Sequence, residues 1–218
     1  LVAEARSRAG AGLDCFVAAG HGRSYGATSR VGWRRLPSIL GCGLWRALDR
    51  LPRGDHDPLA LITDVGNDLL YGFTPDQVAA WVAVVTDRLR ERGAKVVLTR
   101  LPLASIAGVG PLRFRCLRAC YVPGCRLSLR DVKAAATALD ERLGELAATR
   151  GVSLVEQPGE WYGLDAIHVR RRRLDRLWAR VAEAWGMPDS PRRRSATMLE
   201  WMRIGSRAAE VRVLAGRV

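Results

Sequence analysis

Two short apolar runs, each leading into glycine, mark the first half of the chain. Residues 14–19 read DCFVAA and lead into GHGRSYG, and residues 59–65 read LALITDV and lead into Gly66. Both runs are nearly continuous in apolar residues rather than alternating, which is typical of strands buried on both faces of a parallel sheet. We therefore expect two parallel strands, each followed by a loop.

A helix and a further strand follow the second run. Thr74 can cap this helix, with proline at the first helical position, and Gln77 completes a capping box. Its apolar face follows at helical spacing: Val78, Trp81, Val82, Val85 and Leu89. Gly93 is placed to end the helix, and residues 95–99 (KVVLT) form the next strand. This strand–helix–strand unit predicts two parallel strands joined by a right-handed crossover.

The second half of the chain repeats this alternation after a long irregular connection. Residues 100–127 are rich in proline and glycine, and 112–121 could form a short helix within them. Connections of this length are often lids or binding loops. Ser128 caps a second long helix, 152–155 form a short strand, and a loop leads into a last helix. The apolar stripes of these helices are Val132, Ala135, Ala136, Leu139, Leu143 and Leu146, then Leu174, Leu177, Trp178, Val181 and Trp185.

The alternation predicts an α/β fold, a three-layer α/β/α sandwich with a small, mostly parallel sheet, as in flavodoxin-like proteins. The 218 residues suffice for one well-buried domain, which we place at 1–187. Residues 188–218 form a separate basic tail, for which a disordered segment and a docked helix both stay open. No apolar run is long enough to span a bilayer. The chain starts at Leu1, so its N-terminus could be incomplete.

The charge and the cysteines change this picture little. The net charge is +13, but only Lys95 and Lys133 are lysines among the 35 basic residues. So strong a bias towards arginine is typical of GC-rich coding, and we do not expect nucleic acid as the partner. The five cysteines are odd in number and lack the paired spacing of a zinc site, which predicts free thiols and a cytoplasmic location.

Polar residues follow three of the expected strands. Ser24 comes after the first strand, Asn67 after the second, and Asp165 and His168 follow the strand at 152–155. The carboxyl ends of parallel strands form the ligand-binding edge of such a sheet. A hydroxyl, an amide and an Asp/His pair at one edge are the components of acyl-transfer chemistry.

Each group has a role in that chemistry. Ser24 is the expected nucleophile, His168 the base that takes its proton, and Asp165 the group that orients the imidazole. The side chain of Asn67 and the backbone N–H of Ser24, with that of a glycine, are the expected donors to the oxyanion.

The order of these groups resembles the SGNH/GDSL hydrolase family over residues 13–186. Gly22-Arg23-Ser24 stands where the family has Gly-Asp-Ser, with arginine in place of the aspartate. Gly66-Asn67-Asp68 is similar to the family's Gly-x-Asn-Asp without the spacer, and 165–168 (DAIH) fit its Asp-x-x-His. The family's isolated glycine falls within 39–43, where we select Gly43 over Gly41 as a donor to the oxyanion.

The resemblance implies a serine esterase that cleaves a small-molecule ester, a short acyl ester, an acetylated sugar or a lipid, through a covalent acyl-enzyme. It implies no cofactor and no metal. Three alternatives stay open: an acyltransferase with the same triad, an inactive relative that acts as a binding protein, and a basic nucleic-acid binder that uses 170–173 and the tail. The oligomeric state also stays open. We expect residues 100–127, with Trp161 and Tyr162, to shape the substrate site.

Overall fold

A three-stranded parallel sheet lies at the centre of the structure, a computed structural model that describes residues 14–20, 22–31, 34–51 and 57–187. Its strands are β3 (Leu59–Ile62), β4 (Lys95–Thr99) and β5 (Ser153–Val155), with β4 in the middle. In register, Leu61 pairs with Val97, and Leu98 pairs with Leu154. The parallel pairing of β3 with β4, predicted from the sequence, is confirmed.

The predicted strand at 14–19 is wrong. The structure assigns residues 14–20 to no strand, and the side chains of Phe16 and Val17 are 40% and 43% exposed. The expectation rested on burial of this run within the sheet, and such burial is not found. A hairpin that the sequence analysis missed follows instead, formed by the antiparallel strands β1 (Ser29–Val31) and β2 (Arg34–Leu36).

Two long helices begin at the predicted caps. In α4 (Pro75–Arg90), the Thr74 side chain accepts from the backbone of Gln77 and the Gln77 side chain accepts from the backbone of Thr74. In α7 (Leu129–Arg150), Ser128 and Asp131 make the same reciprocal pair. Capping needs only residues close in sequence, which is why these starts could be predicted.

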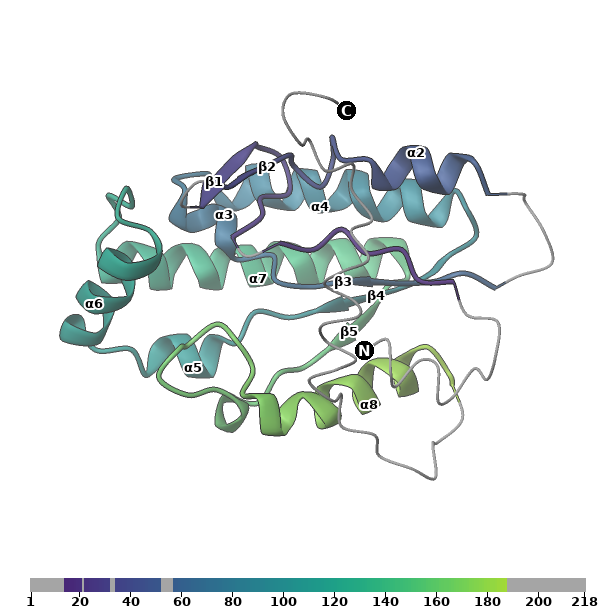
Figure 1. Ribbon diagram of the computed structural model, residues 1–218. Helices are drawn as coiled ribbons and strands as arrows, with labels where there is room; N and C mark the ends of the chain where they lie inside the picture. Colours follow the sequence, from purple (N-terminus) through teal and green to yellow (C-terminus); the bar gives the residue numbers. More distant parts are fainter. Residues whose placement is uncertain (1–13, 21, 32–33, 52–56, 188–218) are drawn as a thin grey trace.

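Helices cover both faces of the sheet (Figure 1). On β4, Val96 and Leu98 pack into the core shared with α4 and α7, whereas Val97 packs into a second core with Leu177 and Val181 of α8 (Leu174–Ala184). This alternation along one strand buries both of its sides. The fold is therefore mixed α/β around a small parallel sheet, as expected.

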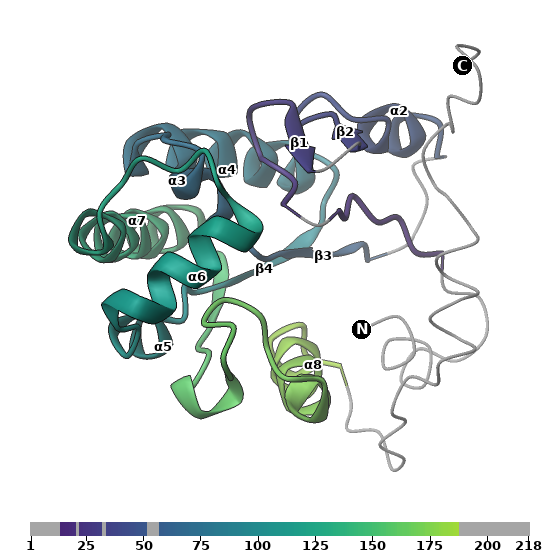
Figure 2. The ribbon, with the colours of Figure 1, turned by 60° about the vertical axis from the view of Figure 1, so that its left-hand side comes forward.

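The remaining helices surround the carboxyl ends of the strands or pack beside the hairpin. They are α2 (Leu44–Asp49), α3 (Asn67–Leu70), α5 (Leu103–Ala107) and α6 (Pro111–Tyr121), with short 3-10 turns at Gly159–Trp161 and Arg171–Arg173. The expected short helix at 112–121 corresponds to α6, which lies at the end of the molecule beside α5 (Figure 2). The tail at 188–218 lies outside the described residues.

Gly26 permits the approach of Trp81 to the chain that precedes the hairpin. A Cβ atom at Gly26 would lie 2.1 Å from the indole ring of Trp81. We expect Gly26→Ala to lower the free energy of unfolding by about 1–3 kcal/mol through overpacking. Gly124→Ala is the matched control, because a Cβ atom there meets nothing within 4 Å. Urea denaturation of both variants measures the difference, and equal stabilities would contradict this account of the packing.

Candidate functional site

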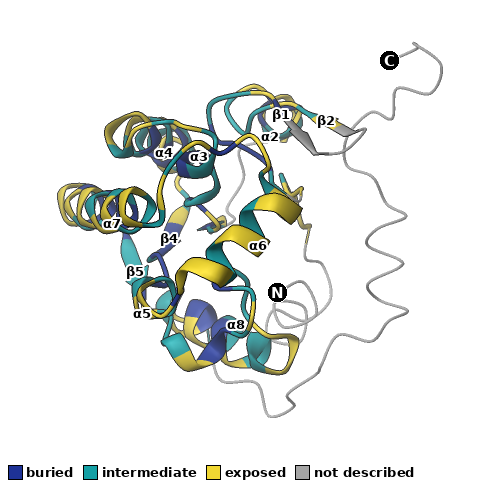
Figure 3. Ribbon diagram, turned by 90° about the vertical axis from the view of Figure 1, so that its left-hand side faces the viewer, coloured by how far each residue is buried: buried dark blue, intermediate teal, exposed yellow. Residues whose placement is uncertain are grey.

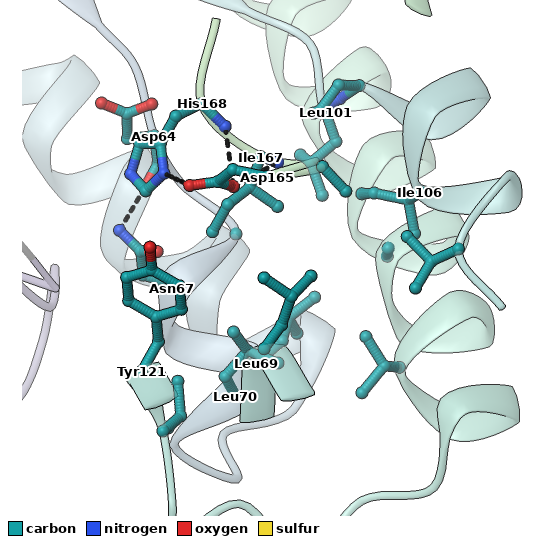
Figure 4. A pocket seen from close by; sticks show the side chains of 18 of the residues that line it. Asp64, Asn67, Leu69, Leu70, Leu101, Ile106, Tyr121, Asp165, Ile167 and His168 are labelled. Atoms are coloured by element: carbon teal, nitrogen blue, oxygen red, sulfur yellow. Dashed lines mark hydrogen bonds and ion pairs between the residues drawn. The ribbon is translucent and has the colours of Figure 1, made fainter. Parts of the chain in front are cut away.

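A cavity of about 210 Å3 opens at the carboxyl ends of the three strands. Its wall is formed by segments that follow β3, β4 and β5, together with α6 and α7. Figure 4 shows that the polar side chains of Asp64, Asn67, Asp165 and His168 gather at one end of the wall, with Tyr121 beside Asn67. Mostly apolar side chains line the remainder. The cavity thus combines a few polar groups with a mostly apolar interior, which is the usual composition of a small-molecule site.

The predicted pair of Asp165 and His168 lies at the polar end. Asp165 Oδ2 and His168 Nδ1 are 2.5 Å apart. The other carboxylate oxygen of Asp165 accepts from the backbone N–H groups of Ile167 and His168, at 3.0 and 3.3 Å. One carboxylate therefore fixes both the loop and the imidazole, the latter through Nδ1.

The contact between His168 and Asp165 shifts the pKa values of the two side chains in opposite directions. The hydrogen bond to Asp165 raises the pKa of His168 above its ordinary value; burial opposes this, and the charges of Asp165 and Asp64 add to it. Burial alone would raise the pKa of Asp165, but the hydrogen bonds from His168 and Ile167 bring it below the ordinary value. The pair is thus arranged to hold a proton on the imidazole next to an ionised carboxylate.

Asp64 belongs to the site, although the sequence analysis assigned it no role. Strand β3 ends at Ile62, so Asp64 lies beyond the strand, where it adopts a φ of 56°. It is the one non-glycine residue with positive φ in the described part of the chain, and such outliers concentrate at functional sites. Burial raises the pKa of its carboxyl; the charge of His168 opposes this, and that of Asp165 adds to it.

Asn67, the expected oxyanion donor, also lines the polar end of the cavity. It opens α3, and its side-chain amide donates to the backbone oxygen of Asp64 over a long 3.5 Å. A bond of this length is weak, so the amide can turn towards a ligand at low cost. The structure therefore brings together three of the predicted residues: Asn67, Asp165 and His168.

Ser24 lies apart from this group. Its side chain is fully buried and is not part of the cavity wall. The hydroxyl donates to Asp68 Oδ1 and accepts from the backbone N–H of Ala27, while Asp68 Oδ2 accepts from the backbone of Tyr25. The Ser24 hydroxyl is therefore bonded to buried Asp68 and not to His168, the base expected to take its proton. Among the described residues of this segment, Gly22, with a φ of 67°, lines the cavity.

The glycines selected as oxyanion donors do not reach the cavity either. Gly43 precedes α2, and neither it nor Gly41 contributes to the cavity wall. Arg23, which replaces the family's aspartate, is buried and donates to the backbone oxygens of Ala19 and Pro37. The segment around Ser24 is therefore held by buried hydrogen bonds rather than by contacts with the site.

The apolar part of the cavity comes largely from the region expected to shape the substrate. Leu101, Ile106, Phe114 and Leu117, all within 100–127, line it together with residues of α3 and α7. Trp161 and Tyr162 instead pack in the core beneath α8. Within the described ranges, no three His, Cys, Asp or Glu side chains are grouped to hold a metal ion.

No model of a known protein family matches this chain, and no curated protein matches it. Among the helices that the structure describes, none is long and apolar enough to cross a membrane.

Proposed function

We propose that the chain hydrolyses esters with an apolar acyl group, with His168 as the general base. The observation that carries this proposal is the Asp165–His168 pair at the polar end of an apolar cavity. A base held by a carboxylate can remove a proton from an attacking group, and an apolar cavity can hold the hydrocarbon part of the substrate. The resemblance of 66–68 and 165–168 to the SGNH/GDSL hydrolases supports the same class of reaction.

We further propose that a water molecule, rather than Ser24, attacks the ester. His168 Nε2 takes one proton of the water as its oxygen bonds to the carbonyl carbon, and Asn67 donates to the resulting oxyanion. The carbon–oxygen bond to the alcohol then breaks, and His168 returns the proton to the leaving oxygen. The products are a carboxylic acid and an alcohol. The proposal follows from the placement of Ser24, whose hydroxyl is bonded to Asp68 away from the cavity.

The test is hydrolysis of a series of p-nitrophenyl esters, from acetate through butyrate and octanoate. We expect kcat/KM to rise from acetate to the longer chains, because the wall beyond the polar end is mostly apolar. Each turnover should release one acid and one p-nitrophenol without a burst equal to the enzyme concentration. Absence of hydrolysis across the series, in a folded protein, would refute the proposal, and a stoichiometric burst would refute the water mechanism.

The pH profile should report the charge of Asp64. His168 must be neutral to act as a base, and its pKa is raised, so kcat/KM should fall with decreasing pH through a limb above the ordinary value of 6.5. Asp64→Asn removes one of the negative charges that raise this pKa. We therefore expect the acidic limb of the variant to lie at lower pH than that of the wild type. An unchanged limb, or one at higher pH, would contradict this role of Asp64.

A further inference from the structure

The two most exposed large apolar side chains of the described residues lie on neighbouring segments beside the cavity. Leu112, at the start of α6, is 77% exposed, and Leu164, in the loop before His168, is 87% exposed. Arg113 joins these segments, since its guanidinium donates to the backbone oxygens of Leu164 and Gly163 at 2.8 and 2.6 Å. Leucines at this level of exposure, on two segments joined by Arg113, indicate a contact surface.

Helix α6 presents an unusual outer face. Its exposed residues include a single charge: Pro111, Leu112, Arg115, Cys116, Ala119, Cys120 and Tyr121. Figure 3 shows this exposed stripe along α6. The opposite face carries Phe114 and Leu117, which line the cavity. Helix α6 therefore lies between the cavity and the outside, and its C-terminal residues Cys120 and Tyr121 are exposed and also line the cavity.

The charge around these side chains is predominantly positive: Asp165 is the one acidic residue within 163–172, and it pairs with His168. Residues 101–130 contain five arginines and no aspartate or glutamate. Beyond the Leu164 loop, Arg170, Arg171 and Arg172 are exposed, and Arg170 packs beside Gly163. Exposed leucines surrounded by arginines are the arrangement by which peripheral proteins bind anionic lipid, with the apolar groups in the interface and the cations at the phosphates.

We propose that α6 and residues 163–172 form a docking face for an anionic lipid surface. The same helix would then contact the lipid and wall the cavity, so that an apolar ligand could pass from the membrane into the cavity. A second copy of the chain or residues 188–218 suit this face less well, because both carry an excess of arginine. Duplex nucleic acid would match the arginines but leave Leu112 and Leu164 without an apolar partner.

Co-sedimentation of the full chain with vesicles tests the docking face directly and does not depend on ester hydrolysis. We expect binding to phosphatidylcholine vesicles that contain phosphatidylglycerol, and much weaker binding to pure phosphatidylcholine. Leu112→Asp/Leu164→Asp should weaken binding at least about tenfold. The matched control is Leu51→Asp/Val84→Asp, which places the same charges at exposed apolar positions outside the docking face and should bind as the wild type does.

A second pair of variants separates charge at this face from net charge. Arg115→Glu/Arg172→Glu should abolish the preference for phosphatidylglycerol, whereas Arg46→Glu/Arg90→Glu, with the same net charge, should keep most of it. Circular dichroism confirms that each variant is folded. Three results would overturn the proposal. They are an equal loss of the phosphatidylglycerol preference in both double variants, no vesicle binding by the wild type, and binding to a duplex oligonucleotide in place of vesicles.

Discussion

His168→Ala should lower kcat/KM for ester hydrolysis by about 10²–10⁴-fold, the usual contribution of a general base. The side chain is partly exposed at the cavity, so its loss should leave the core and the folded state intact. The rate is measured with the p-nitrophenyl ester that the wild type cleaves best, and thermal unfolding checks the fold. A folded variant with the wild-type rate would remove His168 from the reaction.

Asp165→Asn provides the graded comparison for this prediction. An asparagine can still accept from the backbone N–H groups that hold the loop, but it carries no charge to stabilise a protonated His168. We expect kcat/KM to fall less than in His168→Ala. We also expect the acidic limb of the pH profile of kcat/KM to lie at lower pH than in the wild type. A rate equal to that of the wild type would show that the pair does not act as a unit.

Asp68→Ala should lower the free energy of unfolding by about 2–4 kcal/mol. The carboxylate is fully buried and accepts two hydrogen bonds, from the Ser24 hydroxyl and the Tyr25 backbone. Its removal leaves the backbone N–H of Tyr25 without this acceptor in the protein interior, which is costly. Chemical denaturation of the purified variant gives the value.

Asp68→Asn should cost less, because its single amide oxygen can still accept one of the two bonds. This pair of variants also bears on Ser24. If the hydrogen bond between Asp68 and Ser24 is structural, its loss should lower the free energy of unfolding and leave kcat unchanged. A loss of kcat with unchanged stability would contradict that role and favour Ser24 as a participant in the reaction.

The parts of the fold that could be predicted depend on residues close in sequence. The caps at Thr74 and Ser128 and the apolar stripes of α4 and α7 are local signals, and the structure confirms them. The strand expected at 14–19 depended on long-range pairing, for which a short apolar run gives no evidence. The hairpin at β1 and β2 lacks the alternating pattern that identifies such strands, and it was missed for that reason.

The candidate site divides in the same way. Asp165 and His168 are three residues apart, so their contact could be inferred from spacing, and the structure confirms it. The partner of the Ser24 hydroxyl could not be inferred from spacing, because Asp68 and His168 both follow predicted strands at the same edge of the sheet. In the structure, the buried Asp68 binds the hydroxyl. Asp64 was missed because the apolar run 59–65 conceals the end of β3 at Ile62. The signal that could have identified Asp64 is its position just after the carboxyl end of β3, where ligands bind in parallel sheets.

The central claim is that His168, and not Ser24, activates the attacking group. It is tested most directly by measuring kcat/KM of Ser24→Ala and His168→Ala side by side, corrected for the folded fraction, with a fluorophosphonate probe applied to the wild type. We predict that Ser24→Ala keeps kcat/KM within about tenfold of the wild type, that His168→Ala loses it, and that Ser24 is not labelled. Equal losses in both variants, with covalent labelling of Ser24, would contradict the claim and establish a serine esterase.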